Sequence, residues 1–158
     1  MTWTAAVTRI TGDLISASDY NGQIIGNLNH LYQRPAWEAE YKVPSDINKT
    51  GTTFTDVDAT HLKVDITNET PQLMCAAMVP TSGLSGGVAY LDFILDSTTR
   101  AGHATYGSAV GGRDQTIPVI GRFTGVTAGS HTIKLQYKTN GTSVGVADEF
   151  VHMMVWEL

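Results

Sequence analysis

Short segments in which apolar and polar residues alternate fill the chain from residue 37 to its end. In WEAEYKV (37–43), Trp37, Ala39 and Tyr41 alternate with charged residues, and SHTIKLQYKT (130–139) has the same pattern. A period of two is typical of a strand with one buried face. Turn-forming clusters rich in Gly, Asn and Ser separate these segments. We therefore expect about eight to ten short antiparallel strands, arranged as a sandwich, barrel or jelly roll.

Four of these segments carry more specific predictions. LMCAAMV (73–79) is apolar throughout, which predicts a strand buried on both faces. TIPVIGRF (116–123) contains a proline, which predicts an edge strand or a bulge. Asn140-Gly141 predicts a tight turn that makes a hairpin with the strand before it. FVHMMVWEL (150–158) predicts a final strand.

The segment before the first strand has the signals of one short helix. Ser16 and Ser18 can cap its start, and Pro35 ends it. Ala17, Ile24, Leu28 and Leu31 recur on one face of that helix. An isolated helix of about sixteen residues is marginal in water, so this one must dock on another surface. We place the domain boundary here, with an arm and helix over residues 1–34 and the β-domain over residues 35–158.

Composition excludes several classes of protein. The 158 residues carry a formal net charge of -5 and only 16% charged residues, with no basic run, which argues against a nucleic-acid partner. No apolar stretch approaches 18 residues, which argues against a membrane partner. The single cysteine, Cys75, rules out an intrachain disulfide, and the first residues lack the features of a signal peptide. We therefore expect synthesis in a reducing cytoplasm.

No motif in the chain supplies a catalytic or metal site. The five histidines are scattered, and no G-x-S-x-G sequence occurs. Two weaker candidates stay open: an ion held by copies of His103 at a threefold axis, and a calcium site at Asp56 and Asp58. We expect no catalytic residue, no bound metal and no cofactor, and hence a protein that is not an enzyme.

The N-terminal segment resembles a known module. Trp3, GDLISA (12–17), Asn21, NLN (27–29) and Leu31 are similar in order and spacing to the N-terminal module of small tailed-bacteriophage and prophage virion proteins. The likeness covers residues 2–32 and departs from the family at Ile25-Gly26, where a charged pair is usual. It implies that this segment anchors the protein to the virion, through Trp3, Leu14, Ile15, Asn21, Ile24, Ile25, Leu28 and Leu31.

The C-terminal segments carry a second resemblance. A glycine-containing turn leading into SHTIKLQYKT, a further turn and FVHMMVWEL look like the last strands of jelly rolls of the tumour-necrosis-factor and complement-C1q type. That likeness implies a homotrimer. The candidate residues of the trimer interface are Trp37, Tyr137, Met153 and Trp156.

Together, these observations predict a mainly β protein, with an extended N-terminal arm and one short α-helix before an antiparallel β-sandwich of jelly-roll type. They also predict that it is a structural bacteriophage virion protein. We expect a homotrimeric capsid decoration protein on the surface of the phage particle, docked by its N-terminal arm on the major capsid protein or another virion protein. One alternative is a short tail-tip or fibre-head adhesin that binds a host surface glycan. A metal-dependent or hydrolytic enzyme is the other alternative.

Overall fold

The computed structural model describes residues 36–82, 88–102, 105–108, 115–140 and 144–158. These residues form twelve β-strands and no helix, and within them nothing is both helical and apolar over a length that could cross a membrane. The predicted arm and helix, with all eight anchor residues, lie outside the described part of the chain. The domain boundary therefore stays a prediction.

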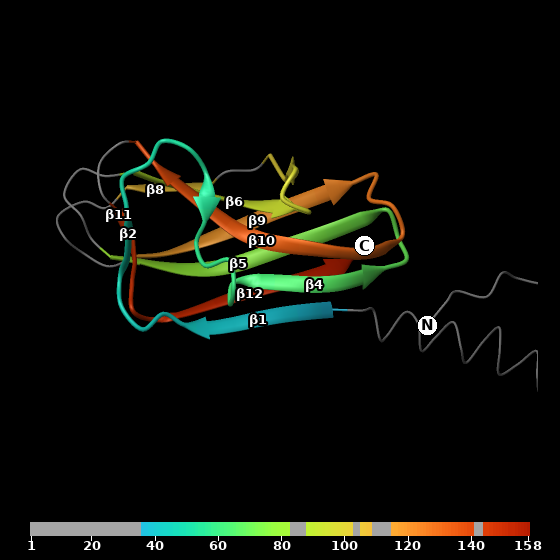
Figure 1. Ribbon diagram of the computed structural model, residues 1–158, viewed down its shortest axis with the longest axis horizontal. Coiled ribbons are helices and arrows are strands. Elements are labelled where there is room, and N and C mark those ends of the chain that lie inside the picture. The colour runs from blue at the N-terminus through green and yellow to red at the C-terminus, as the bar shows by residue number, and fades with distance from the viewer. Residues whose placement is uncertain (1–35, 83–87, 103–104, 109–114, 141–143) are drawn as a thin grey trace, which may run out of the picture. The chain divides into compact units, whose positions relative to one another are not determined.

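The strands form two antiparallel sheets that pack face to face as a jelly-roll sandwich (Figure 1). In the first sheet, β1 pairs β12, β12 pairs β5, and β5 pairs β9, while β11 joins β5 to β2. Its strands are β1 (Ala36–Lys42), β2 (Ile47–Lys49), β5 (Gln72–Ser82), β9 (Gln115–Thr124), β11 (Val144–Val146) and β12 (Phe150–Glu157). Figure 1 shows β1, β12 and β5 running side by side, in blue, red and green.

The second sheet is built around β10, which pairs β6 on one side and both β3 and β4 on the other. Beyond β6 lie the short strands β7 and β8. The strands of this sheet are β3 (Thr55–Asp56), β4 (Lys63–Asn68), β6 (Val88–Leu95), β7 (Thr99–Arg100), β8 (Thr105–Ser108) and β10 (Gly129–Thr139).

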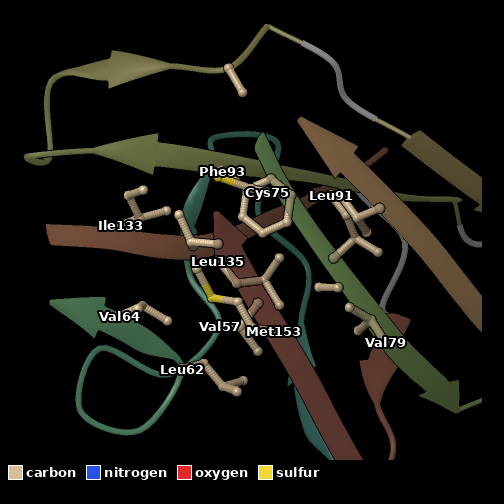
Figure 2. Packing of buried hydrophobic residues seen from close by; sticks show 14 of the residues in the cluster. Val57, Leu62, Val64, Cys75, Val79, Leu91, Phe93, Ile133, Leu135 and Met153 are labelled. Atoms are coloured by element: carbon tan, nitrogen blue, oxygen red, sulfur yellow. The ribbon is translucent and has the colours of Figure 1, made fainter. Parts of the chain in front are cut away.

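Every second residue of the long strands points between the sheets and builds the core, as the alternation in the sequence predicts. Leu135 and Phe93 are fully buried partners across β10 and β6, and Met153 and Cys75 come from the opposite sheet (Figure 2). Burial of such side chains stabilises the sandwich by roughly 1.5–3 kcal/mol each. Because Gly121 has no side chain, the ring of Phe93 can approach the backbone of β9: a Cβ at Gly121 would lie 2.8 Å from it.

The structure corrects the prediction for residues 73–79. In β5, Leu73, Cys75 and Val79 face the core, but Met78 points outward and keeps 48% of its surface exposed. The strand is therefore covered on one face only within the described chain. A run of apolar residues indicates that both faces of a strand are shielded from water. It does not indicate whether the same chain shields both faces.

The predicted hairpin at Asn140-Gly141 is also wrong. β10 lies in one sheet, between β6 and the β3–β4 edge, whereas β11 lies in the other sheet, between β5 and β2. β10 and β11 therefore do not pair with each other as a hairpin. The proline-containing strand agrees better with its prediction, because among the described strands of its sheet β9 pairs with β5 alone.

Candidate functional site

The outward face of the first sheet is mostly apolar at its centre, across β12, β5 and β9, where His152 is also present. Register places Met154 of β12 beside Ala76 of β5, and Ala76 beside Ile120 of β9. The residue pairs on either side of this row across the three strands place further apolar side chains on the same face. We call this set the apolar face: Met74, Ala76, Met78, Pro118, Ile120, Met154 and Trp156. A shallow hollow of about 190 Å³ runs along it, between β12, β5 and β9.

Three large side chains of the apolar face are exposed in the single chain. Ile120 keeps 60% of its surface, Met78 48% and Met154 46%. Single exposed apolar residues are normal, whereas contiguous groups of them are typical of interaction surfaces. The face therefore has the composition of an interface.

The two edges of this face carry opposite charges. On β1, Glu38 lies beside Met154, and the Glu40 carboxylate lies 3.0 Å from His152 Nδ1. On β9, at the other edge, the Arg122 guanidinium donates a hydrogen bond to the Gln72 side chain. An acidic edge and a basic edge on one apolar face are complementary between copies of the same chain.

The outward face of the second sheet is built differently. Asp56 accepts hydrogen bonds from Lys134 Nζ at 3.1 Å and from Gln136 Nε2 at 2.8 Å. Asp92 is almost fully buried and pairs with the guanidinium of Arg100 at 2.6 Å. These polar groups bond to one another within the chain. The two faces therefore differ, because the large exposed apolar side chains gather on the first sheet.

A separate polar pocket of about 380 Å³ opens where β1, β4, β10 and the β6–β7 turn meet. Its wall combines one aromatic ring with carboxylate, imidazole and hydroxyl groups. The lining residues are Trp37, Asp65, Ile66, Thr67, Asp96, Ser130, His131 and Thr132. Strand register brings these side chains together, because Asp65 of β4 lies opposite Thr132 of β10 and Thr67 lies opposite Ser130.

Asp96 organises one end of this polar pocket. Its Oδ1 accepts a hydrogen bond from the Thr132 backbone N–H at 2.9 Å, and its Oδ2 lies 2.6 Å from His131 Nδ1. The other ring nitrogen, Nε2, lies 2.8 Å from the carbonyl oxygen of Thr127. A carboxylate and a carbonyl only accept hydrogen bonds, so both contacts are satisfied together when the His131 ring is the doubly protonated imidazolium.

The pKa values in the polar pocket follow from these contacts. The hydrogen bond to Asp96, and then the one to the Thr127 carbonyl, raise the pKa of His131 above its ordinary value. Desolvation opposes ionisation of Asp96, but the hydrogen bonds from Thr132 and His131 outweigh it and lower the pKa of that carboxyl. Hydrogen bonds from the Thr132 hydroxyl and from Lys63 lower the pKa of Asp65.

We expect the free energy of unfolding to fall as the pH rises through the pKa of His131. Because this pKa is higher in the folded state, the contribution is complete below the unfolded value of about 6.5 and is lost above the folded value. Urea unfolding between about pH 6 and pH 9 measures the effect. In the variant His131→Asn, this part of the pH dependence should disappear. An identical pH profile in the variant would show that His131 does not supply it.

The residues predicted to form the trimer interface fall in different places. Trp156 lies on the apolar face, and Trp37 is half-buried at the polar pocket. Tyr137 and Met153 lie in the core; the Tyr137 hydroxyl donates a hydrogen bond to the Ile47 carbonyl at 2.9 Å. These two side chains are occupied by contacts within one subunit.

The predicted calcium candidates do not share a site. Asp56 faces Lys134 and Gln136, whereas Asp58 accepts hydrogen bonds from the backbone N–H groups of Thr60 and His61, each at 2.8 Å. Within the described residues, no group of three or more His, Cys, Asp or Glu side chains gathers to hold a metal. His103 lies outside those residues.

Cys75 is buried, and burial raises the pKa of its thiol to about 12. A thiol with so high a pKa stays protonated near neutral pH and is a poor nucleophile. The side chain therefore acts as part of the core, where Figure 2 shows it next to Phe93.

Sequence reasoning missed both sites described above. The polar pocket joins residues as far apart as Trp37 and Thr132, and only strand register brings them together. The apolar face had a signal in the continuous run at residues 73–79, which predicted a covered outer face without showing what covers it.

No protein-family model matches the chain, and no curated protein matches it in sequence. Solved structures do match its fold. The T13 particle of infectious bursal disease virus aligns with 79% of this chain at a TM-score of 0.51 and 12% identity, over 35% of the viral chain. The VP2 protein of the same virus, in derived T=1 particles, aligns with 79% of this chain at a TM-score of 0.49 and 12% identity, over 36% of VP2.

Another match is Eiger TNF from S. frugiperda, which aligns over 79% of this chain and 92% of its own, at a TM-score of 0.47 and 9% identity. The chain spans about a third of the length of the viral chains that it matches. At such identities, similarity shows the fold alone. The β-domain therefore has the sandwich fold that is also present in a chain of the infectious bursal disease virus particle.

Proposed function

We propose that this chain is a structural virion protein of a bacteriophage, and that it works as a homotrimeric capsid decoration protein without catalytic activity. The observation that carries the proposal is the apolar face of the first sheet, which the described residues of one chain leave exposed. The sandwich fold found in a viral-particle chain, and the N-terminal resemblance to phage virion proteins, support a place on a phage particle.

The edges of the apolar face fit a cyclic assembly. A closed ring joins two different patches of each subunit, in contrast to a twofold dimer. In the proposed trimer, three apolar faces surround the threefold axis, and the β1 edge of one copy meets the β9 edge of the next. Glu38 and Glu40 then approach Arg122 of the neighbouring copy, so that unlike charges meet.

We expect the full-length protein to have three times the chain mass of 17.0 kDa, about 51 kDa. Light scattering after gel filtration at micromolar concentration measures this directly. A single species of 17.0 kDa would contradict the assembly role of the apolar face. A mass twice that of the chain would keep an assembly but contradict the trimer.

Attachment to the particle follows from the N-terminal resemblance. We propose that residues 1–34 dock on the major capsid protein or another virion protein, which leaves the β-domain outward on the virion surface. Electron cryomicroscopy of intact particles that carry the protein tests this part. Density for the sandwich on the capsid surface is the expected result, and density confined to the tail would contradict the decoration role.

A further inference from the structure

The polar pocket has the composition of a sugar-binding site, a function that the assembly role does not require. We propose that it binds a neutral, hydroxyl-rich saccharide against Trp37, Asp65 and Asp96. Its volume of about 380 Å³ lies within the range of small-molecule sites, roughly 300–1,000 Å³. The proposal rests on the chemistry of this wall and is independent of the trimer.

Trp37 supplies the apolar part of the recognition. The residue is half-buried and packs against the core, and it also lines the polar pocket. A tryptophan fixed in this way offers a rigid aromatic surface with little conformational entropy left to lose. A sugar ring has an apolar C–H face and a rim of hydroxyl groups, so it can pack on an indole while its hydroxyls reach polar neighbours.

Asp65 and Asp96 supply acceptors for those hydroxyls. Asp65 Oδ1 accepts a hydrogen bond from the Thr132 hydroxyl at 2.7 Å, and its Oδ2 accepts one from Lys63 Nζ at 2.9 Å. An ionised carboxylate has about four acceptor positions, so both side chains can accept further hydrogen bonds. They keep 62% and 44% of their surfaces exposed, respectively, and can therefore reach a ligand.

The acceptors are held in place before any ligand arrives. Asp96 and Ser97 form a tight two-residue turn with φ values of 50° and 60°, closed by a hydrogen bond from the Thr98 N–H to the Leu95 carbonyl at 3.0 Å. The His131 ring and the Thr132 N–H then fix both oxygens of Asp96. A preorganised site loses less entropy on binding, which matters for a small ligand that makes few contacts.

Charge selects among possible sugars. The two carboxylates of the wall repel an acidic sugar, and their cationic neighbours Lys63 and His131 are already bonded to them. A ligand with neutral hydroxyl donors satisfies the remaining acceptor positions without that repulsion. The wall therefore favours neutral hexoses and N-acetylhexosamines over sialic or uronic acids.

Titration of the full-length chain with methyl glycosides of glucose, galactose, mannose and N-acetylglucosamine tests the proposal, with saturation-transfer NMR as the readout. We expect at least one of them to bind with a millimolar dissociation constant, roughly 1–10 mM. The methyl glycoside of N-acetylneuraminic acid and ethanolamine serve as the anionic and the cationic probe. Equal or tighter binding of either probe would overturn the neutral-sugar assignment.

Variants locate the binding. Asp65→Asn and Trp37→Ala should each weaken it about tenfold or more, a loss of 1.4 kcal/mol or above. The matched control Asp56→Asn alters a carboxylate on the outer face of the same sheet and should leave the affinity unchanged.

Since Trp37 also packs on the core, Trp37→Phe provides a variant that keeps an aromatic ring, and it should bind the glycoside more tightly than Trp37→Ala does. No binding at about 50 mM glycoside, or binding that survives both Asp65→Asn and Trp37→Ala, would overturn the proposal.

Discussion

Replacing Ile120 by Glu should convert the proposed trimer into single chains of 17.0 kDa. Among the described residues, Ile120 is the most exposed large apolar side chain, and it lies in one row with Ala76 and Met154 on the apolar face. An unpaired carboxylate buried at that point costs several kcal/mol, which raises the dissociation constant by about a thousandfold or more. Light scattering at micromolar concentration measures the mass, and circular dichroism verifies that the sheets are retained.

A matched control distinguishes the effect of this position from the effect of an added negative charge. Thr99→Glu introduces the same carboxylate at an exposed position of β7, in the other sheet. That variant should keep the mass of the unmodified protein. If Ile120→Glu also keeps that mass, the apolar face is not the surface that joins the copies.

The second large effect concerns the core. Leu135 is fully buried in the middle of β10, where its backbone N–H donates to the Leu62 carbonyl and its carbonyl accepts from the Val57 N–H. Leu135→Ala removes three heavy atoms from this packed region and leaves a cavity, which should lower the free energy of unfolding by about 2–5 kcal/mol. Urea denaturation at one fixed protein concentration measures the change.

Leu158→Ala is the control for this prediction. It makes the same truncation at a residue with 36% of its surface exposed, and it keeps the backbone hydrogen bond from Leu158 to the Gln72 carbonyl. We expect a change within about 0.5–1 kcal/mol there. Similar losses in both variants would mean that the centre of the sandwich is not where the described packing places it.

Local pattern was sufficient to predict most of the strands. The alternation at residues 37–43 and 130–139 predicted β1 and β10 and the side of each that faces the core. The final apolar segment became β12, and the proline in residues 116–123 correctly indicated an edge strand. Strand period and turn chemistry are properties of neighbouring residues, so a single sequence contains them.

Pairing between distant strands could not be predicted in this way. The Asn140-Gly141 signal describes a local turn, whereas the assignment of β10 and β11 to different sheets depends on β5 and β6, more than forty residues earlier. The polar pocket could not be predicted for the same reason. Asp96 and His131 come together only through the pairing of β6 with β10. The continuous run at residues 73–79 predicted that both sides of β5 are covered, and the described residues cover only one side.

The methionines of β12 and β5 provide the most direct test of whether copies of the chain cover the apolar face. Peroxide converts exposed methionine to the sulfoxide, and burial protects the thioether. Met78 and Met154 point outward with about half their surface exposed in one chain, whereas Met153, next to Met154, is fully buried in the core. Peptide mass spectrometry after timed oxidation gives the rate at each residue in the assembled protein and in Ile120→Glu. We predict that Met78 and Met154 react about tenfold or more slowly in the assembled protein than in the variant, while Met153 is protected in both. Oxidation of Met78 and Met154 at the same fast rate in both proteins would contradict the account.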